Sequence, residues 1–239
     1  MDDRPLIGDM LMDEVRLLTF RRPSQGLQEN AGAYLAFGLV CAWLAGLGRY
    51  WDNPRAALWQ HLGLGSVAYV FVLAALLWAL LAPLRPSRWT YRNVLLFVTL
   101  TSPPAFLYAI PVEHFMSAAA ARATNSWFLA LVAAWRVALL YVFLKRFARL
   151  SGNALLVALL LPLTIIVIAL AVLNLEHATF DFMGGLRTDD GTSNDGAYAF
   201  VSLLSMLCIL LAPLLIVGYL NCIYHAWWQA RENARSREP

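Results

Sequence analysis

Two stretches of the chain share one pattern of apolar and polar positions. Residues 93–114 read NVLLFVTLTSPPAFLYAIPVEH, and residues 153–177 read NALLVALLLPLTIIVIALAVLNLEH. Each follows basic residues, begins Asn-x-Leu-Leu, carries almost no charge and ends Glu-His. At about 1.5 Å per residue, a helix over either stretch is roughly 30–35 Å long, which matches the hydrocarbon core of a bilayer. The pattern therefore predicts two membrane-spanning helices that run in the same direction.

Four more apolar runs have a similar length, so we expect an all-α, polytopic bundle of six transmembrane helices. The expected spans cover residues 31–49, 66–84, 93–112, 126–144, 153–175 and 197–224. They form one transmembrane domain over residues 31–224, between an N-terminal segment over residues 1–30 and a tail over residues 225–239. Residues 50–66 form either a loop or a re-entrant segment.

The third span is expected to be broken or kinked near its middle. Pro103 and Pro104 lie there side by side. Proline has no backbone N–H to donate, and its ring clashes with the preceding turn, so a regular helix cannot run through the pair. The first span, by contrast, carries Gly32, Gly38 and Gly46, small residues that allow close helix packing.

The basic residues predict how the bundle is oriented, because cytoplasmic loops carry an excess of arginine and lysine. One side of the bundle would hold the two termini and the loops after the second and fourth spans. That side carries thirteen basic residues: Arg4, Arg16, Arg21, Arg22, Arg85, Arg88, Arg92, Lys145, Arg146, Arg149, Arg231, Arg235 and Arg237. The other side carries four: Arg49, Arg55, Arg122 and Arg187. Both termini are therefore expected in the cytoplasm, which requires an even number of spans.

Composition supports a membrane location and excludes other classes of protein. Of the 239 residues, 60% are hydrophobic and 14% are charged, against about 25% charged in an average soluble protein. The formal charge of +3 is no signature of nucleic-acid binding. The three cysteines lie in apolar runs, which excludes a disulfide framework. Lys145 is the only lysine among eighteen basic residues, a bias that indicates a bacterial genome and so a bacterial inner (plasma) membrane.

The N-terminal segment has a helical pattern of its own. Ile7, Leu11, Val15 and Leu18 recur at helical spacing before the first span. Such a helix could lie in the cytoplasmic interface of the membrane, with its apolar side in the lipid. The alternative is a short cap over the helix bundle.

Imidazole and carboxylate groups gather on the outer side of the predicted bundle. Both are ligands for zinc and similar ions. If the odd-numbered spans cluster, a metal site could form there from His61, His114, His177, Glu113 and Glu176. The alternative is that the two Glu-His pairs are only polar helix ends at the membrane boundary. No cofactor other than such a metal ion is expected.

Arg136 lies about ten residues into the fourth span, close to the expected centre of the bilayer. An arginine at that depth should face the bundle interior and find a partner. In the structural interpretation its partner is a carbonyl freed by Pro103 and Pro104, Thr99, Thr101, or an acidic group drawn in from the membrane boundary. In the functional interpretation it binds an anionic substrate or a lipid headgroup.

Two stretches resemble the Yip-domain family of small polytopic membrane proteins, in its bacterial branch. Residues 17–30, LLTFRRPSQGLQEN, have an LL-x-F-x-x-P approach to the first span, and residues 97–107, FVTLTSPPAFL, combine small polar residues with proline. The resemblance implies a non-enzymatic membrane protein and gives no catalytic residues. The family commonly has five spans, whereas six are expected here.

Three functions are compatible with these features. The first is a non-enzymatic, Yip-like integral membrane protein that organises or partners other membrane components, including other copies of itself, within the lipid bilayer. The second is a small transporter or channel with a site near Arg136 and the Pro103-Pro104 break, because interrupted helices are typical of transport sites. The third is a metal-dependent membrane enzyme that uses the outer histidines and glutamates.

Overall fold

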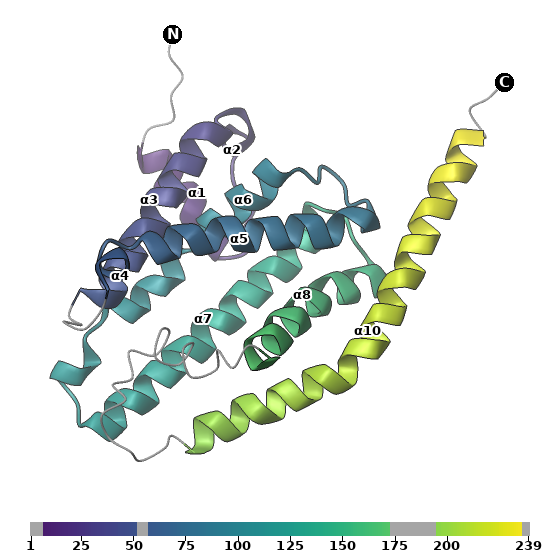
Figure 1. Cartoon of the computed structure of the whole chain (residues 1–239). Coiled ribbons are helices and arrows are strands. Elements are labelled where there is room, and N and C mark those ends of the chain that lie inside the picture. Colours follow the sequence, from purple (N-terminus) through teal and green to yellow (C-terminus); the bar gives the residue numbers. More distant parts are fainter. Residues whose placement is uncertain (1–6, 52–56, 173–194, 236–239) are drawn as a thin grey trace, which may run out of the picture.

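The structure is a computed structural model of the whole chain, and it describes residues 7–51, 57–172 and 195–235. Every regular element among these residues is a helix (Figure 1). The order is α1 (Ile7–Leu18), α2 (Gly26–Glu29), α3 (Ala31–Tyr50), α4 (Leu58–His61), α5 (Leu64–Leu81), η1 (Ala82–Leu84), α6 (Tyr91–Leu100), η2 (Pro103–Ala109), η3 (Val112–His114), α7 (Ala118–Arg146), α8 (Gly152–Val172) and α10 (Asp195–Arg235).

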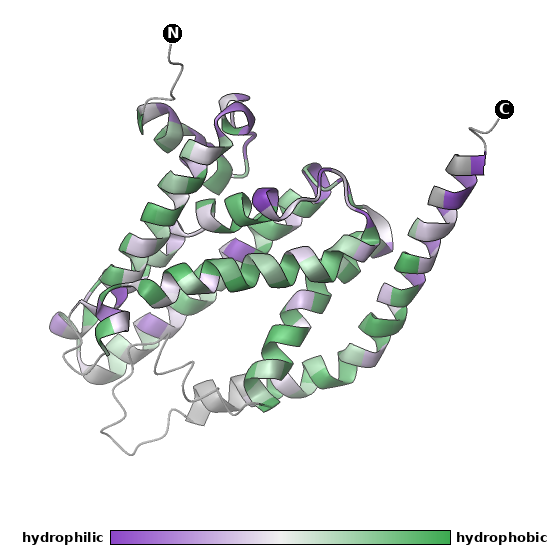
Figure 2. Cartoon of the chain, turned by 45° about the horizontal axis from the view of Figure 1, so that its top comes forward, coloured by the Kyte–Doolittle hydropathy of each residue, from purple (hydrophilic) through white to green (hydrophobic). Residues whose placement is uncertain are grey.

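Among the residues that the structure describes, five helices are long and apolar enough to cross a membrane: α3, α5 with η1, α7, α8 and α10. Figure 2 shows hydrophobic residues along most of these helices, with hydrophilic ones collected in the turns and at the C-terminal end of α10. The predicted all-helical membrane bundle is therefore confirmed in outline. The sixth span and the cytoplasmic position of the termini stay predictions.

The expected third span is not one continuous helix. Its N-terminus is capped by Thr90, whose hydroxyl accepts the N–H of Asn93 at 3.3 Å. Helix α6 ends at Leu100, and the tighter 3₁₀ helix η2 follows from Pro103. The predicted break is confirmed, and its cause is the missing N–H of two successive prolines.

Other boundaries differ from the expected spans. Helix α7 begins at Ala118, earlier than expected, because the Ser117 hydroxyl accepts the N–H of Ala120 and so caps the helix. Helix α10 has 41 residues and runs on to Arg235, through most of the expected tail. At about 1.5 Å per residue it is roughly 60 Å long, about twice the thickness of the hydrocarbon core. Its ends therefore project beyond the membrane.

Glycines of α3 allow two neighbouring segments to approach its backbone, as predicted. A Cβ atom at Gly38 would lie 2.7 Å from Oγ1 of Thr99 in α6. One at Gly46 would lie 2.8 Å from the carbonyl oxygen of Gly63, the residue before α5. Gly63 itself has φ +67°, a left-handed conformation that favours glycine. The backbone of α3 therefore lies close to the residues that begin α5 and to the broken third span.

The main apolar core lies among α5, α6, α7 and α8. Side chains at its centre include Ala74, Leu81, Val94, Leu144 and Ala158, all fully buried. Phe97 of α6 stacks on Phe143 of α7 at 4.2 Å between ring centroids. Helix α10 packs on the outside of α8 (Figure 1), where Leu215 meets Val157 and Leu161.

Substitution of Gly38 tests this packing. The Gly38→Ala variant should lose about 1–3 kcal/mol of stability, because the new methyl group overlaps the Thr99 side chain and forces α3 and α6 apart. Gly32→Ala is the matched control: its Cβ would meet only the flexible end of Arg92, at 3.8 Å. The measurement is the thermal unfolding midpoint of the purified full chain in detergent. Equal midpoints for the two variants would contradict the close approach.

Candidate functional site

Helix α1 rests on the bundle with two of its three acidic residues, Asp13 and Glu14, turned inward. Met10 and Leu17 pack against a small core formed with α3 and α6. Between them on the same face lie Asp13 and Glu14, which are 1% and 5% exposed. The apolar stripe of α1 is turned outward instead: Ile7, Leu11 and Val15 are 71%, 52% and 55% exposed. The predicted helix is confirmed: it lies on the bundle, its stripe residue Leu18 packs against the main core, and the other three stripe residues face outward.

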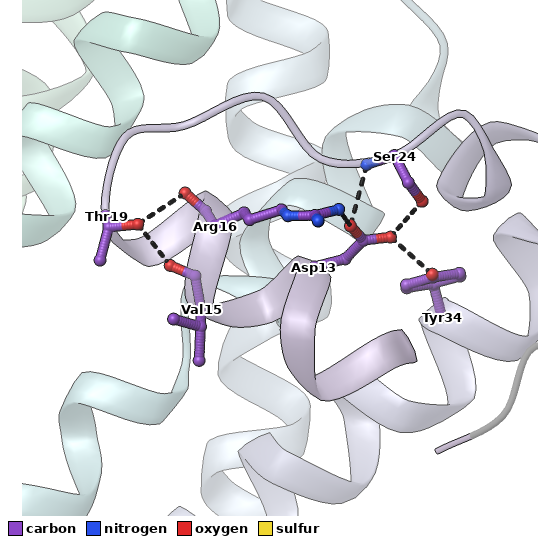
Figure 3. A network of polar contacts seen from close by, with 6 residues as sticks. All are labelled: Asp13, Val15, Arg16, Thr19, Ser24 and Tyr34. Carbon is purple, nitrogen blue, oxygen red and sulfur yellow. Dashed lines mark hydrogen bonds and ion pairs between the residues drawn. The ribbon is translucent and has the colours of Figure 1, made fainter. Parts of the chain in front are cut away.

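The Asp13 carboxylate is held by donors from three residues (Figure 3). Oδ1 accepts the backbone N–H of Ser24 at 2.9 Å and Nη1 of Arg16 at 3.1 Å. Oδ2 accepts the hydroxyl of Tyr34 at 2.7 Å and the hydroxyl of Ser24. The carboxylate thus joins α1 to the turn that follows it and to the first turns of α3.

The donors around Asp13 also set its protonation state. Burial alone would raise the pKa of this carboxyl group. The hydrogen bonds from Ser24, Tyr34 and Arg16 favour the charged form and outweigh burial, so the pKa of Asp13 is lowered. Asp13 is therefore ionised at neutral pH. Its charged carboxylate is the group that attaches α1 to the N-terminal part of the fold.

The neighbouring acid, Glu14, has the opposite environment. Neither of its carboxyl oxygens has a hydrogen-bond partner in the described part of the chain, although both are buried. Burial raises the pKa of Glu14 to about 8. Two adjacent carboxyl groups on one helix are thus driven into different protonation states by their surroundings.

Helix α7 fixes the turn at the end of α1. The indole N–H of Trp135 donates to the carbonyl of Leu18 at 2.9 Å, and Arg146 donates to the carbonyl of Phe20 at 2.6 Å. Phe20 has φ +62°, which turns the chain sharply after α1. The position of Glu14 is therefore set by α3 on one side and by α7 through this turn.

Arg136 binds the interrupted third span. In a continuous α-helix the N–H of Ala105 would bond the carbonyl of Thr101, but here it bonds the carbonyl of Ser102 at 2.9 Å. The freed Thr101 carbonyl accepts Nε of Arg136 at 3.0 Å. The guanidinium also lies 5.8 Å from the ring centre of Tyr69 in α5. Thr101 is one of the partners that the structural interpretation of Arg136 names.

A second arginine lies among tyrosines near the end of α3. The Arg49 guanidinium is 5.3 Å from the ring centre of Tyr108 in η2 and 5.7 Å from that of Tyr50. Such cation–π contacts stabilise a guanidinium that is removed from water. Arginine and tyrosine from α3, α5, α7 and η2 therefore share one region of the bundle beside the helix break.

The predicted metal site cannot be assembled from the described residues. His61 is half-buried at the end of α4, and His114 is exposed at the end of η3. Glu113 belongs to η3, whereas Glu176 and His177 lie outside the described residues. Across residues 7–51, 57–172 and 195–235, no group of three His, Cys, Asp or Glu side chains could hold an ion. The metal site stays a prediction.

A shallow hollow of about 440 Å³ lies on the C-terminal part of α10. Its lining consists of Leu220, Ile223, Tyr224, Trp227, Trp228 and Arg231. Arg85, in the turn after η1, stacks over the Trp227 ring at 4.0 Å. Aromatic and basic side chains in this combination are typical of the boundary between lipid and water.

Sequence reasoning missed the pair Asp13 and Glu14. The pattern of α1 placed the apolar stripe correctly, but an apolar stripe normally marks the buried side of a helix. Here the buried side is adjacent to the stripe and carries both acids. The one available signal was the pairing of two acids on a helix whose other polar residues are Asp9 and Arg16.

Comparisons of the chain with protein-family models, with curated proteins and with solved structures found no match. The resemblance to the Yip-domain family therefore stays an interpretation of two short stretches.

Replacement of Arg136 tests its role at the helix break. Arg136→Leu should lower stability by about 1.5–3 kcal/mol, because the Thr101 carbonyl loses a charged donor inside the bundle. The measurement is the thermal unfolding midpoint in detergent, with Arg92→Leu on the exposed side of α6 as the control. An unchanged midpoint for Arg136→Leu would refute the structural role.

Proposed function

We propose that the protein is a non-enzymatic integral membrane protein that organises or partners other membrane components. The observation that carries this proposal is the orientation of α1. Asp13 fastens the side of the helix that carries Glu14 to the bundle, and Ile7, Leu11 and Val15 face outward. A helix held in this way offers a fixed apolar surface to the lipid interface or to another membrane protein.

The hydrogen bonds at the helix break also favour a function at the protein surface over one inside the bundle. At the helix break, the hydroxyls of Thr99 and Thr101 donate to the carbonyls of Leu96 and Val98, each at 3.0 Å. Nε of Arg136 donates to the Thr101 carbonyl, which the break leaves without its helical donor. These hydroxyl protons and Nε of Arg136 therefore stabilise the interrupted helix.

The Yip-like stretches lie at the two places where polar contacts gather. Residues 17–30 include Ser24, which holds Asp13, and residues 97–107 include Thr101, which accepts Arg136. We propose on this ground a Yip-like role in a bacterial inner membrane. The partners are then the lipid bilayer, other membrane proteins or further copies of the chain.

The interruption of α6 favours a second candidate, a small transporter or channel. Transport sites are often built where helices break inside the membrane and leave backbone groups to bind a solute or ion. The break next to Arg136 has this form. No observation on the described residues favours a metal-dependent enzyme.

A photo-crosslinking experiment in cells separates the two candidates. A photoreactive amino acid at Leu11, on the outward side of α1, should crosslink to a discrete membrane protein or to a second copy of the chain. The same amino acid at Leu210, an exposed apolar position on α10, is the control and should yield lipid adducts only. Asp13→Ala should abolish the Leu11 product, because α1 loses its anchor.

Two results together would contradict the proposal. The first is the absence of any protein crosslink at Leu11 that is specific relative to Leu210. The second is solute or ion flux into liposomes that contain the purified full chain, above that of protein-free liposomes. Flux of this kind would instead support the transporter or channel.

A further inference from the structure

Glu14 is a buried acid that no contact of the fold explains. Its side chain is 5% exposed, and neither carboxyl oxygen has a partner among the described residues. An ionised carboxylate without donors is costly in such surroundings, whereas a neutral carboxyl group is tolerated far better. The fold therefore places an acid where only its protonated form is stable.

Among the described residues, no charged group is paired with the Glu14 carboxyl group. Helix α3 contributes Cys41, and Tyr34 on the same helix donates its hydroxyl to Asp13 instead. Helix α6 contributes apolar side chains to this junction. Among the charged groups near α1, Asp9 is exposed on the same helix, Arg16 pairs with Asp13, and Arg146 of α7 binds the Phe20 carbonyl.

We propose that Glu14 is a proton-binding site whose occupancy controls how tightly α1 is docked on the bundle. With the proton bound, the uncharged side chain stays in the junction between α1 and α3. When the proton leaves, the carboxylate must reach water or a new donor, and this requires α1 to move outward. Asp13 stays ionised throughout and keeps α1 tethered, so the movement is a partial release.

The direction of the pH effect follows from the two states of the chain. The pKa of Glu14 is about 8 in the folded protein and 4.5 in an unperturbed chain. Between these values the folded protein holds a proton that the unfolded chain has released. Stability conferred by this proton is complete below about pH 4.5 and falls as the pH rises toward 8.

Infrared difference spectroscopy of the full chain in lipid nanodiscs tests the site directly. The carbonyl stretch of a protonated carboxylic acid should be present at neutral pH and disappear with a midpoint near pH 8. Glu14→Gln should remove this band without loss of fold, because glutamine has the same shape. Asp9→Asn, on the exposed part of the same helix, should leave the band unchanged.

Amide hydrogen exchange of residues 7–18 tests the consequence. The wild-type chain should exchange faster than Glu14→Gln at pH 9, and the two should exchange alike at pH 6. Comparison at equal pH removes the intrinsic pH dependence of exchange. A carboxyl band that titrates near 4.5 or survives Glu14→Gln would overturn the site. Equal exchange of the two chains at both pH values would overturn its control of α1.

Discussion

The Asp13 carboxylate is the contact on which the N-terminal arrangement depends. A carboxylate removed from water is stable only when donors replace its hydration. Ser24, Tyr34 and Arg16 supply those donors, and they come from the turn after α1, from α3 and from α1 itself. One charge therefore fixes the position of three segments. It also decides that the acidic side of α1 is turned inward and its apolar stripe outward.

The same rule accounts for the middle of the bundle. A membrane offers no water to a broken helix, so its free polar groups must be satisfied by the protein. Pro103 and Pro104 end α6, and the Thr101 carbonyl that loses its helical donor is bonded by Arg136 from α7. Among the described residues, the Glu14 carboxyl group is an exception, because neither of its oxygens has a hydrogen-bond partner. Such exceptions are where a fold can respond to a ligand, here a proton.

Much of the fold was predictable from local pattern, because span length, paired prolines and clustered glycines act through the backbone of a single helix. The break at Pro103 and the close packing at Gly38 and Gly46 were predicted and are confirmed. Residues Asp13 and Glu14 could not be predicted, because their state depends on what α3 and the turn at Ser24 bring to them. The sequence pattern also predicted the third span as one stretch over residues 93–112, although its second half is the 3₁₀ helix η2.

The orientation of α1 is tested most directly by a nitroxide scan of residues 7–17 in lipid nanodiscs, in a chain whose three cysteines are replaced. Collision rates with membrane-soluble oxygen report which side of the helix is open to lipid. The account predicts high oxygen accessibility at Ile7, Leu11 and Val15 and low accessibility at Met10 and Leu17. The reverse pattern, with the apolar stripe protected and the acidic side open to water, would contradict it.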